Sequence, residues 1–175
     1  MNPRVLTATR LKEATNATWA EIDLASRMWT IPANRMKGGR EHRVPLPDAA
    51  VAVLKSMQEI RHSDYIFPGM HEGRPVGART IADIVKDLAG REITIHGFRS
   101  TFRDWAAERT NFPREVAEMA LAHTILNAVE AAYRRGDLFE KRRKLMEAWA
   151  DHCAKPAARG EVVPIGRRRN ERGAE

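Results

Sequence analysis

Two stretches in the first third of this chain alternate between apolar and polar positions. The first runs from Arg27 to Pro32, with Glu21 to Leu24 leading into it, and the second runs from Glu41 to Pro47. Alternation with a period of two is typical of half-buried strands. Gly38 and Gly39 stand between the two stretches, so we expect a hairpin turn there, entered through an extended piece at 34–37.

Elsewhere, apolar residues recur three and four positions apart, which predicts helices. We expect them at 7–19, 48–60, 78–88, 96–106, 114–122 and 138–152, and a further helix, capped by Asn127, carries Tyr133. Asp48 is the expected N-cap of its helix. Residues 141–144 are expected to face away from Leu145 and Trp149. The helix at 78–88 is expected to end at Gly90 and to turn inward Ile81, Ile84, Val85 and Leu88.

Length and composition fit one globular domain at 1–153, followed by a basic tail. With 175 residues, 43% of them hydrophobic and 30% charged, the chain is large enough to bury one core. Residues 154–175 are rich in Pro, Gly, Ala and Arg, which predicts disorder. The formal net charge of +7 favours a polyanionic partner. Charge alone does not distinguish DNA from RNA or from an anionic membrane.

Cysteine usage and hydropathy indicate the compartment. The single Cys153 excludes an internal disulfide, and no cysteines have the spacing of a zinc site. No apolar run approaches the roughly 18 residues of a membrane span. Met1 to Arg10 lacks the apolar core of a secretion signal. We therefore expect a soluble cytoplasmic protein without a membrane partner.

Residues with catalytic potential gather between Thr94 and Tyr133. His96 and Arg99 stand three residues apart, His123 follows, and Tyr133 comes ten residues later, with no acidic metal site beside them. A site that handles phosphate without metal needs fixed cationic donors, and a tyrosine there can form a covalent phosphoryl intermediate. Taken singly, Tyr133 is more commonly a half-buried aromatic residue and each histidine a structural one. Their joint spacing favours a metal-free DNA phosphotransferase.

Basic residues also gather on the expected hairpin, namely Arg35, Lys37, Arg40 and Arg43. A basic ribbon can lie along a phosphate backbone. The same charges can instead protect an edge strand from aggregation, and composition does not decide between the two. Arg10 and Glu13 share a helical face, and on their own they fit an ordinary surface ion pair.

With these residues in place, the sequence resembles the catalytic domain of the tyrosine recombinases, most closely the integrases of temperate bacteriophages and genomic islands. The similar part spans roughly residues 6–149. Its motifs follow the family's order: Thr7-Ala-Thr-Arg10-Leu-Lys-Glu13, Trp19-Ala-Glu-Ile-Asp23-Leu, Met36-Lys37-Gly-Gly-Arg-Glu-His-Arg-Val-Pro-Leu46, His96-Gly-Phe-Arg99, Leu121-Ala-His123 and Ala132-Tyr133.

The resemblance implies a mainly α fold with a small antiparallel β-sheet (α+β). This is the family's catalytic-domain fold, N-terminally truncated so that the preceding helices and the core DNA-binding domain are missing. The implied function is site-specific DNA recombination through a 3′-phosphotyrosine, with no cofactor. Tyr133 is the implied nucleophile, Arg10 and Arg99 clamp the phosphate oxygens, and Lys37 protonates the leaving 5′ oxygen.

The resemblance also implies supporting roles. His96 assists the proton of the tyrosine or holds the phosphate, His123 donates to a phosphate oxygen, and Glu13 orients Arg10. The implied partner is double-stranded DNA with attachment-type sites, bound by a homotetramer together with accessory DNA-bending proteins. Further expected DNA contacts are Lys12, which stands where the family usually has glycine, Arg35, Arg40, Arg43, Arg103 and Arg134.

Two alternatives to an active integrase remain open. One is a prophage remnant that binds DNA without recombining it. The other is DNA relaxation of the type IB topoisomerase kind, which uses a similar set of residues.

Overall fold

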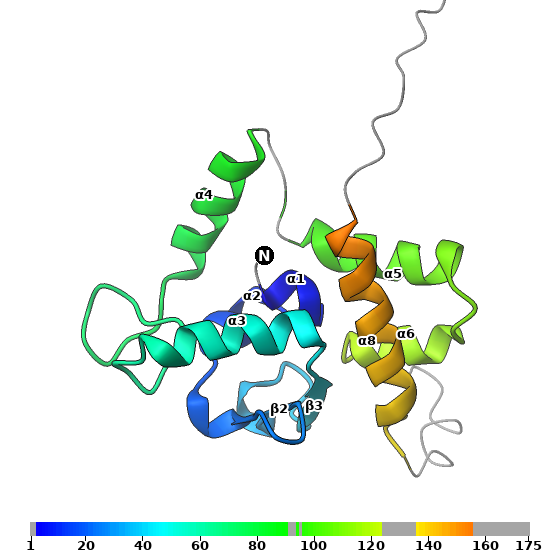
Figure 1. Ribbon diagram of the computed structural model, residues 1–175, viewed down its shortest axis with the longest axis horizontal. Helices are drawn as coiled ribbons and strands as arrows, with labels where there is room; N and C mark the ends of the chain where they lie inside the picture. Colours follow the sequence, from blue (N-terminus) through cyan, green and yellow to red (C-terminus); the bar gives the residue numbers. More distant parts are fainter. Residues whose placement is uncertain (1–2, 91–93, 95, 124–135, 156–175) are drawn as a thin grey trace, which may run out of the picture.

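The computed structural model describes residues 3–90, 94, 96–123 and 136–155. The elements, in chain order, are α1 (Pro3–Thr7), α2 (Leu11–Thr15), η1 (Trp19–Glu21), β1 (Ile22–Asp23), β2 (Met28–Ile31), η2 (Ala33–Arg35), β3 (His42–Pro45), α3 (Asp48–Glu59), α4 (Ala78–Ala89), α5 (Gly97–Arg109), α6 (Arg114–Ala120) and α8 (Phe139–Ala154). Figure 1 shows one small sheet at the bottom of the view, beneath α3. The expected fold class, mainly α with a small antiparallel sheet, is confirmed. The expected helix bearing Tyr133, its Asn127 cap and residues 156–175 of the tail lie outside the described residues.

The sheet contains the predicted hairpin and one short additional strand. Its order is β1-β2-β3, all antiparallel, with Trp29 opposite Val44. Trp29 and Ile31 are buried in the same core as α3, as the alternation requires. The prediction of an extended segment at 34–37 is wrong. The chain forms the 3-10 turn η2 there, which brings the Arg35 guanidinium to the Glu21 carboxylate.

The prediction of a single helix at 7–19 is also wrong, because the chain bends between α1 and α2. Ala8 takes the left-handed conformation, with φ of 51°, and this ends the first helix. The buried hydroxyls of Thr7 and Thr9 share a hydrogen bond of 3.0 Å at the bend. As a result, Arg10 becomes the N-cap of α2 instead of a residue inside a longer helix.

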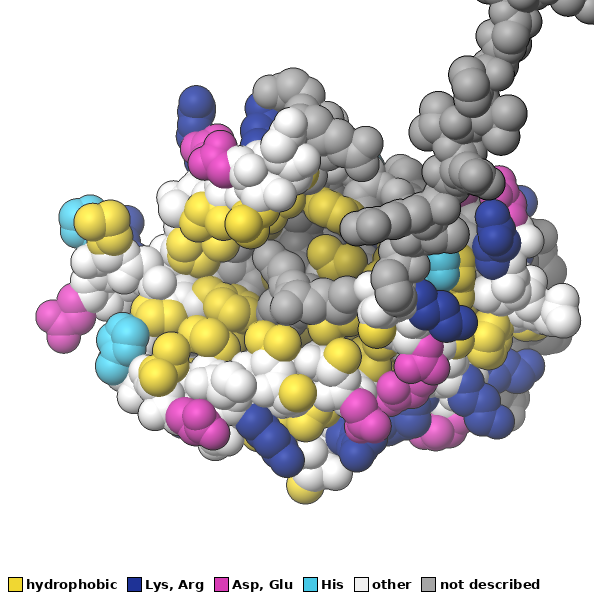
Figure 2. Space-filling view, turned by 45° about the horizontal axis from the view of Figure 1, so that its top comes forward, with side chains coloured by type: hydrophobic (Ala, Val, Ile, Leu, Met, Phe, Trp, Pro, Cys, Tyr) yellow, Lys and Arg dark blue, Asp and Glu magenta, His cyan; other side chains and the backbone are white. Residues whose placement is uncertain are grey.

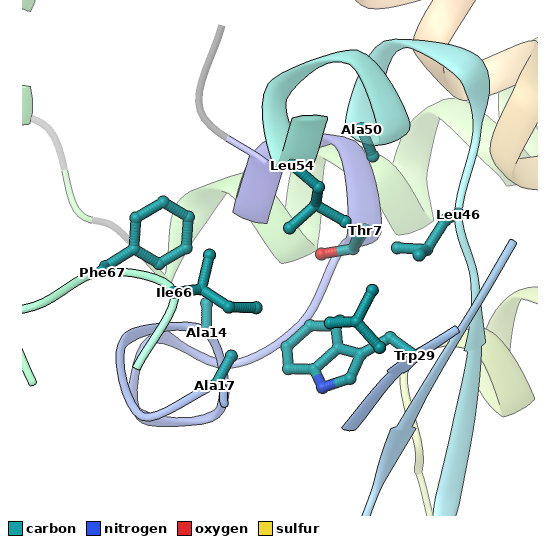
Figure 3. A pocket seen from close by; sticks show the side chains of 10 residues that line it. Thr7, Ala14, Ala17, Trp29, Leu46, Ala50, Leu54, Ile66 and Phe67 are labelled. Atoms are coloured by element: carbon teal, nitrogen blue, oxygen red, sulfur yellow. The ribbon is translucent and has the colours of Figure 1, made fainter. Parts of the chain in front are cut away.

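One hydrophobic core packs the sheet against α1, α2 and α3. Trp29, Leu46 and Leu54 are among its buried residues. A small hollow remains inside it, and Figure 3 shows that apolar side chains and the Thr7 hydroxyl line this space. The hollow is therefore part of the core that supports α1 and α2.

A second core packs α5, α6 and α8 together. The rings of Phe102 and Trp149 meet edge to face there, with centroids 5.4 Å apart. The Trp149 indole N–H donates to the Val5 carbonyl of α1 at 2.6 Å. This bond connects the second core to the first helix, so the segments before Arg10 and around Arg99 share one support.

Helix α4 ends as expected but does not face a core. Its C-cap is Gly90, with φ of 60°. None of its residues is buried in the described structure, and 47% of Ile84 and 83% of Leu88 is exposed, so the expected inward face is wrong. In Figure 1, α4 stands away from the other helices. On the face of the molecule that Figure 2 shows, hydrophobic side chains gather around a hollow.

Two details of the other helices differ from the sequence pattern. Asp48 begins α3 instead of capping it, since Pro47 is the N-cap and Asp48 pairs with Arg27. In α8, Arg142 is not on the exposed side but only 1% exposed, because it lies three residues before Leu145 on the same face. No helix within the described ranges is long and apolar enough to cross a bilayer.

Candidate active site

Arg10 stands at the start of α2 and is held by an acid three residues later. The Glu13 carboxylate accepts hydrogen bonds from the Arg10 backbone N–H at 2.7 Å and from Arg10 Nη1 at 2.8 Å. Glu13 is 4% exposed, whereas 30% of the Arg10 side chain reaches solvent. A buried carboxylate is costly without such partners. The pair is therefore more than a surface ion pair, and it holds a partly accessible guanidinium in one place.

Arg99 lies in the first turn of α5 and is only 5% exposed. Its guanidinium donates to the backbone carbonyls of Ala8 and Leu121. Its Nη2 also lies 3.4 Å from Nε2 of His123. One side chain thus joins the bend before Arg10, the end of α6 and His123.

Backbone strain accompanies these contacts. Ala8 and Ala122 adopt left-handed conformations, with φ of 51° and 49°. Such conformations are uncommon outside glycine and cost roughly 1–3 kcal/mol each. Ala8 supplies one carbonyl acceptor of Arg99, and Ala122 follows the other, Leu121. The strain therefore lies where Arg99 draws distant segments together.

His123 follows α6 and is oriented by Glu118. Its Nδ1 lies 2.5 Å from the Glu118 carboxylate, and its backbone N–H donates to the Glu118 carbonyl at 3.0 Å. With Nδ1 at the acid, Nε2 is the ring atom that faces Arg99. The sequence pattern missed Glu118, because a spacing of five residues is not one of the helical pairs at three or four.

His96 and Lys37 are both exposed. His96 is the N-cap of α5, and its carbonyl accepts the Arg99 backbone N–H at 3.1 Å. A spacing of three residues places His96 and Arg99 on one side of the helix. Lys37 follows the buried Met36 in the turn before β3. Among the described residues, no hydrogen bond or ion pair holds the Lys37 ammonium group.

The structure joins Arg99 to His123 directly, and to the segment that carries Arg10 through the carbonyl of Ala8, two residues before Arg10. It places His96 beside Arg99 on α5 and leaves Lys37 on the hairpin. Tyr133 and Arg134 lie outside the described residues.

The residues expected to contact DNA fall into two groups. Lys12, Arg40 and Arg103 are exposed, and Arg103 faces its neighbour Asp104 at 3.8 Å. Arg35 and Arg43 are held by ion pairs: Arg35 is enclosed beside Glu21, whereas Arg43 pairs with Asp137 at 2.8 Å and stays 43% exposed. Within the described ranges, no three of His, Cys, Asp and Glu gather as a metal site.

His42 of β3 lies close to the charged residues of the site. Burial lowers its pKa to about 4, and the charges of Arg142 and Arg99 act in the same direction. A hydrogen bond with the Ala120 carbonyl and the charge of Glu13 act in the opposite direction. At neutral pH, His42 is therefore an uncharged ring that links β3 to the end of α6.

Arg142 ties α8 to the sheet. It donates to the Arg43 carbonyl at 2.6 Å, the Asp137 carbonyl at 2.7 Å and the Asp137 carboxylate at 2.7 Å. Burial acts to raise the pKa of Asp137, but the hydrogen bond from Arg43 and the charges of Arg142 and Arg43 outweigh it and lower that pKa. His42, Asp137 and Arg142 were not among the site residues predicted from the sequence.

The sequence of this chain is similar to those of known proteins. Residues 4–138 match the family model described as "Phage integrase family". The chain is 40% identical over 163 residues to the prophage integrase IntA of Escherichia coli (strain K12), covering 91% of this chain and 39% of that protein. It is 30% identical over 149 residues to the integrase of Shigella phage Sf6, covering 83% and 38%. The chain thus spans about two fifths of the length of these relatives.

Two solved structures share the fold. The integrase from mycobacterium phage Brujita aligns with a TM-score of 0.63 at 22% identity, covering 83% of this chain and 50% of that one. A XerA recombinase aligns with a TM-score of 0.56 at 17% identity, covering 88% and 56%. Because the family model matches residues 4–138, most of the chain, this chain belongs to the phage integrase family.

Proposed function

We propose that this chain cleaves and rejoins DNA strands in site-specific recombination. The observation that carries the proposal is the pair of arginines, Arg10 and Arg99, each fixed by buried partners, with Arg99 also next to His123. The matched region includes Tyr133, to which we assign the role of nucleophile. Fixed guanidiniums are what a phosphoryl transfer without metal requires, since they neutralise charge that grows on the phosphate oxygens.

In the proposed step, the Tyr133 oxygen attacks the phosphorus of a scissile phosphodiester. A new bond forms between phosphorus and the phenolic oxygen, and the bond from phosphorus to the 5′ oxygen breaks. The products are a 3′-phosphotyrosine and a 5′-hydroxyl. The reverse step, with a 5′-hydroxyl from another strand, rejoins the DNA. Because the phosphodiester energy is retained in the phosphotyrosine, no cofactor is needed.

The remaining site residues carry out the proton transfers and hold the phosphate. The phenol of a tyrosine has an ordinary pKa near 10, so it needs a base and nearby cations to react at neutral pH. We assign that help to His96, and to His123 a hydrogen bond to a phosphate oxygen. The exposed Lys37 protonates the leaving 5′ oxygen, which is worth roughly 10² to 10⁴ in rate for a general acid.

The proposed partner is double-stranded DNA. Lys12, Arg40 and Arg103 are exposed and suit the phosphate backbone, and the proposal extends to Arg43 and Arg134. Exchange between two duplexes cuts four strands, so one tyrosine per strand leads to a homotetramer, with DNA-bending proteins as accessory partners. The relatives come from bacteria and their phages, so we place the reaction in the bacterial cytoplasm.

The test is covalent capture on a pool of nicked DNA duplexes. A nick next to the cleavage site lets a short fragment diffuse away after cleavage, which traps the phosphotyrosine. We expect wild type to give an SDS-stable adduct and a free 5′-hydroxyl, and Tyr133→Phe to give neither. DNA retention without any adduct would instead support the binding-only remnant. Relaxation of supercoiled DNA without joining of separate duplexes would support the topoisomerase-like alternative.

A further inference from the structure

Arg35 lies two residues before Lys37 but turns into the protein. Its side chain is 19% exposed and pairs with the Glu21 carboxylate, which is 10% exposed. Glu21 also accepts a hydrogen bond of 2.9 Å from the Trp29 indole N–H. A guanidinium enclosed in this way is a poor candidate for the phosphate contact expected from its sequence position.

The other terminal nitrogen of Arg35 donates to the backbone carbonyl of Glu13. Glu13 is the residue whose carboxylate holds both the backbone and the side chain of Arg10. Glu13 is therefore held through its main chain by Arg35 and holds Arg10 through its side chain. The contacts form a continuous series from Trp29 through Glu21, Arg35 and Glu13 to Arg10.

Helix α2 needs such support. It contains five residues, Leu11–Thr15, and a helix of that length is not stable by itself. The position of Arg10 at its first turn thus depends on contacts from other elements. Arg35 supplies one from η2, the element directly before the Lys37 turn.

We propose that Arg35 and Glu21 are positioning residues that set the Arg10 guanidinium in place and join the Lys37 turn to it. This inference rests on the proposed function, because it gives Arg10 the task of binding the scissile phosphate. It reassigns Arg35 from DNA contact to support of the active site. A displaced catalytic group commonly costs about 10²-fold in rate.

The first test compares a charged and a neutral scissile phosphate. The substrate is a nicked duplex selected from the capture pool. It is prepared with either an ordinary phosphodiester or a methylphosphonate at the scissile position, and the rate of adduct formation is measured on each. The methylphosphonate lacks the charge that Arg10 neutralises. We expect Arg35→Lys and Glu21→Gln to slow adduct formation by about 10²-fold on the phosphodiester but by less than about threefold on the methylphosphonate, as for Arg10→Ala.

The matched control is Arg79→Lys, because Arg79 forms an exposed ion pair with Asp83 on α4, outside the proposed site. It should react like wild type on both substrates. Equal losses on both substrates in Arg35→Lys would mean a general structural defect and would overturn the proposal. Unchanged rates on both would overturn it as well.

A second measurement does not depend on cleavage. The Arg10 backbone N–H donates to Glu13, so its hydrogen exchange, followed by NMR, reports whether Glu13 stays in place. We expect exchange at Arg10 about 10-fold faster in Arg35→Lys and Glu21→Gln, and unchanged in Arg79→Lys. Unaltered exchange in all three variants contradicts the positioning role. Wild type without any adduct would count against the proposed function, while the exchange rates would still decide this inference.

Discussion

The partial burial of His42 predicts a specific loss of stability in acid. Its pKa is about 4 in the folded protein against 6.5 for an ordinary histidine. Between these values the unfolded chain binds a proton that the folded protein does not. The contribution of the neutral His42 to the free energy of unfolding is therefore fully present above pH 6.5 and is lost as the pH falls toward 4. The difference in pKa corresponds to about 3 kcal/mol.

The assay is urea unfolding of wild type and His42→Gln at a series of pH values from 7.5 to about 4. Glutamine keeps an N–H that can reach the Ala120 carbonyl but does not titrate. Wild type should lose about 3 kcal/mol more than His42→Gln across this range. His71→Gln is the control, because this exposed side chain stays in water in both states. A difference between wild type and His42→Gln that does not vary with pH would refute the reasoning.

Two further predictions concern α8, one on the buried Arg142 and one on the half-buried Cys153. Arg142→Met should lower the free energy of unfolding by about 3–5 kcal/mol, because it removes a buried ion and its bonds to Asp137. The control, Arg143→Met, should cost less than about 1 kcal/mol. Equal losses for the two variants in urea unfolding would contradict the burial of Arg142. Burial raises the pKa of the Cys153 thiol to about 11 from 9.0, so at pH 8 iodoacetamide should modify it about 10²-fold more slowly in the folded protein than in urea. Equal rates by mass spectrometry would show an accessible thiolate.

The sequence predicted the sheet and most helices because their patterns are local. The alternation around Trp29 and Val44 gives the hairpin, and spacing of three and four gives α3, α5 and α6. The bend at Ala8 is not local. It is fixed by Arg99, which lies 91 residues away in the chain, so the pattern around Thr7 suggested one continuous helix.

The candidate site was predictable as a set of residues in order, but its supports were not. Arg142 shares the apolar stripe of Leu145 and Met146, and its charge led to an exposed assignment. Burial is tolerated because Asp137 and the Arg43 carbonyl receive its hydrogen bonds. Such partners come from distant segments, which periodicity along one helix does not report.

The most direct test of the central claim is to identify the residue that becomes bound to DNA. The chain contains two tyrosines, Tyr65 and Tyr133. After capture on nicked duplexes and digestion of protein and DNA, mass spectrometry should find the nucleotide on the Tyr133 peptide, linked through a 3′-phosphate. Tyr65→Phe should form the adduct like wild type, and Tyr133→Phe should not. An adduct on any other residue, or one that persists in Tyr133→Phe, would contradict the proposed mechanism.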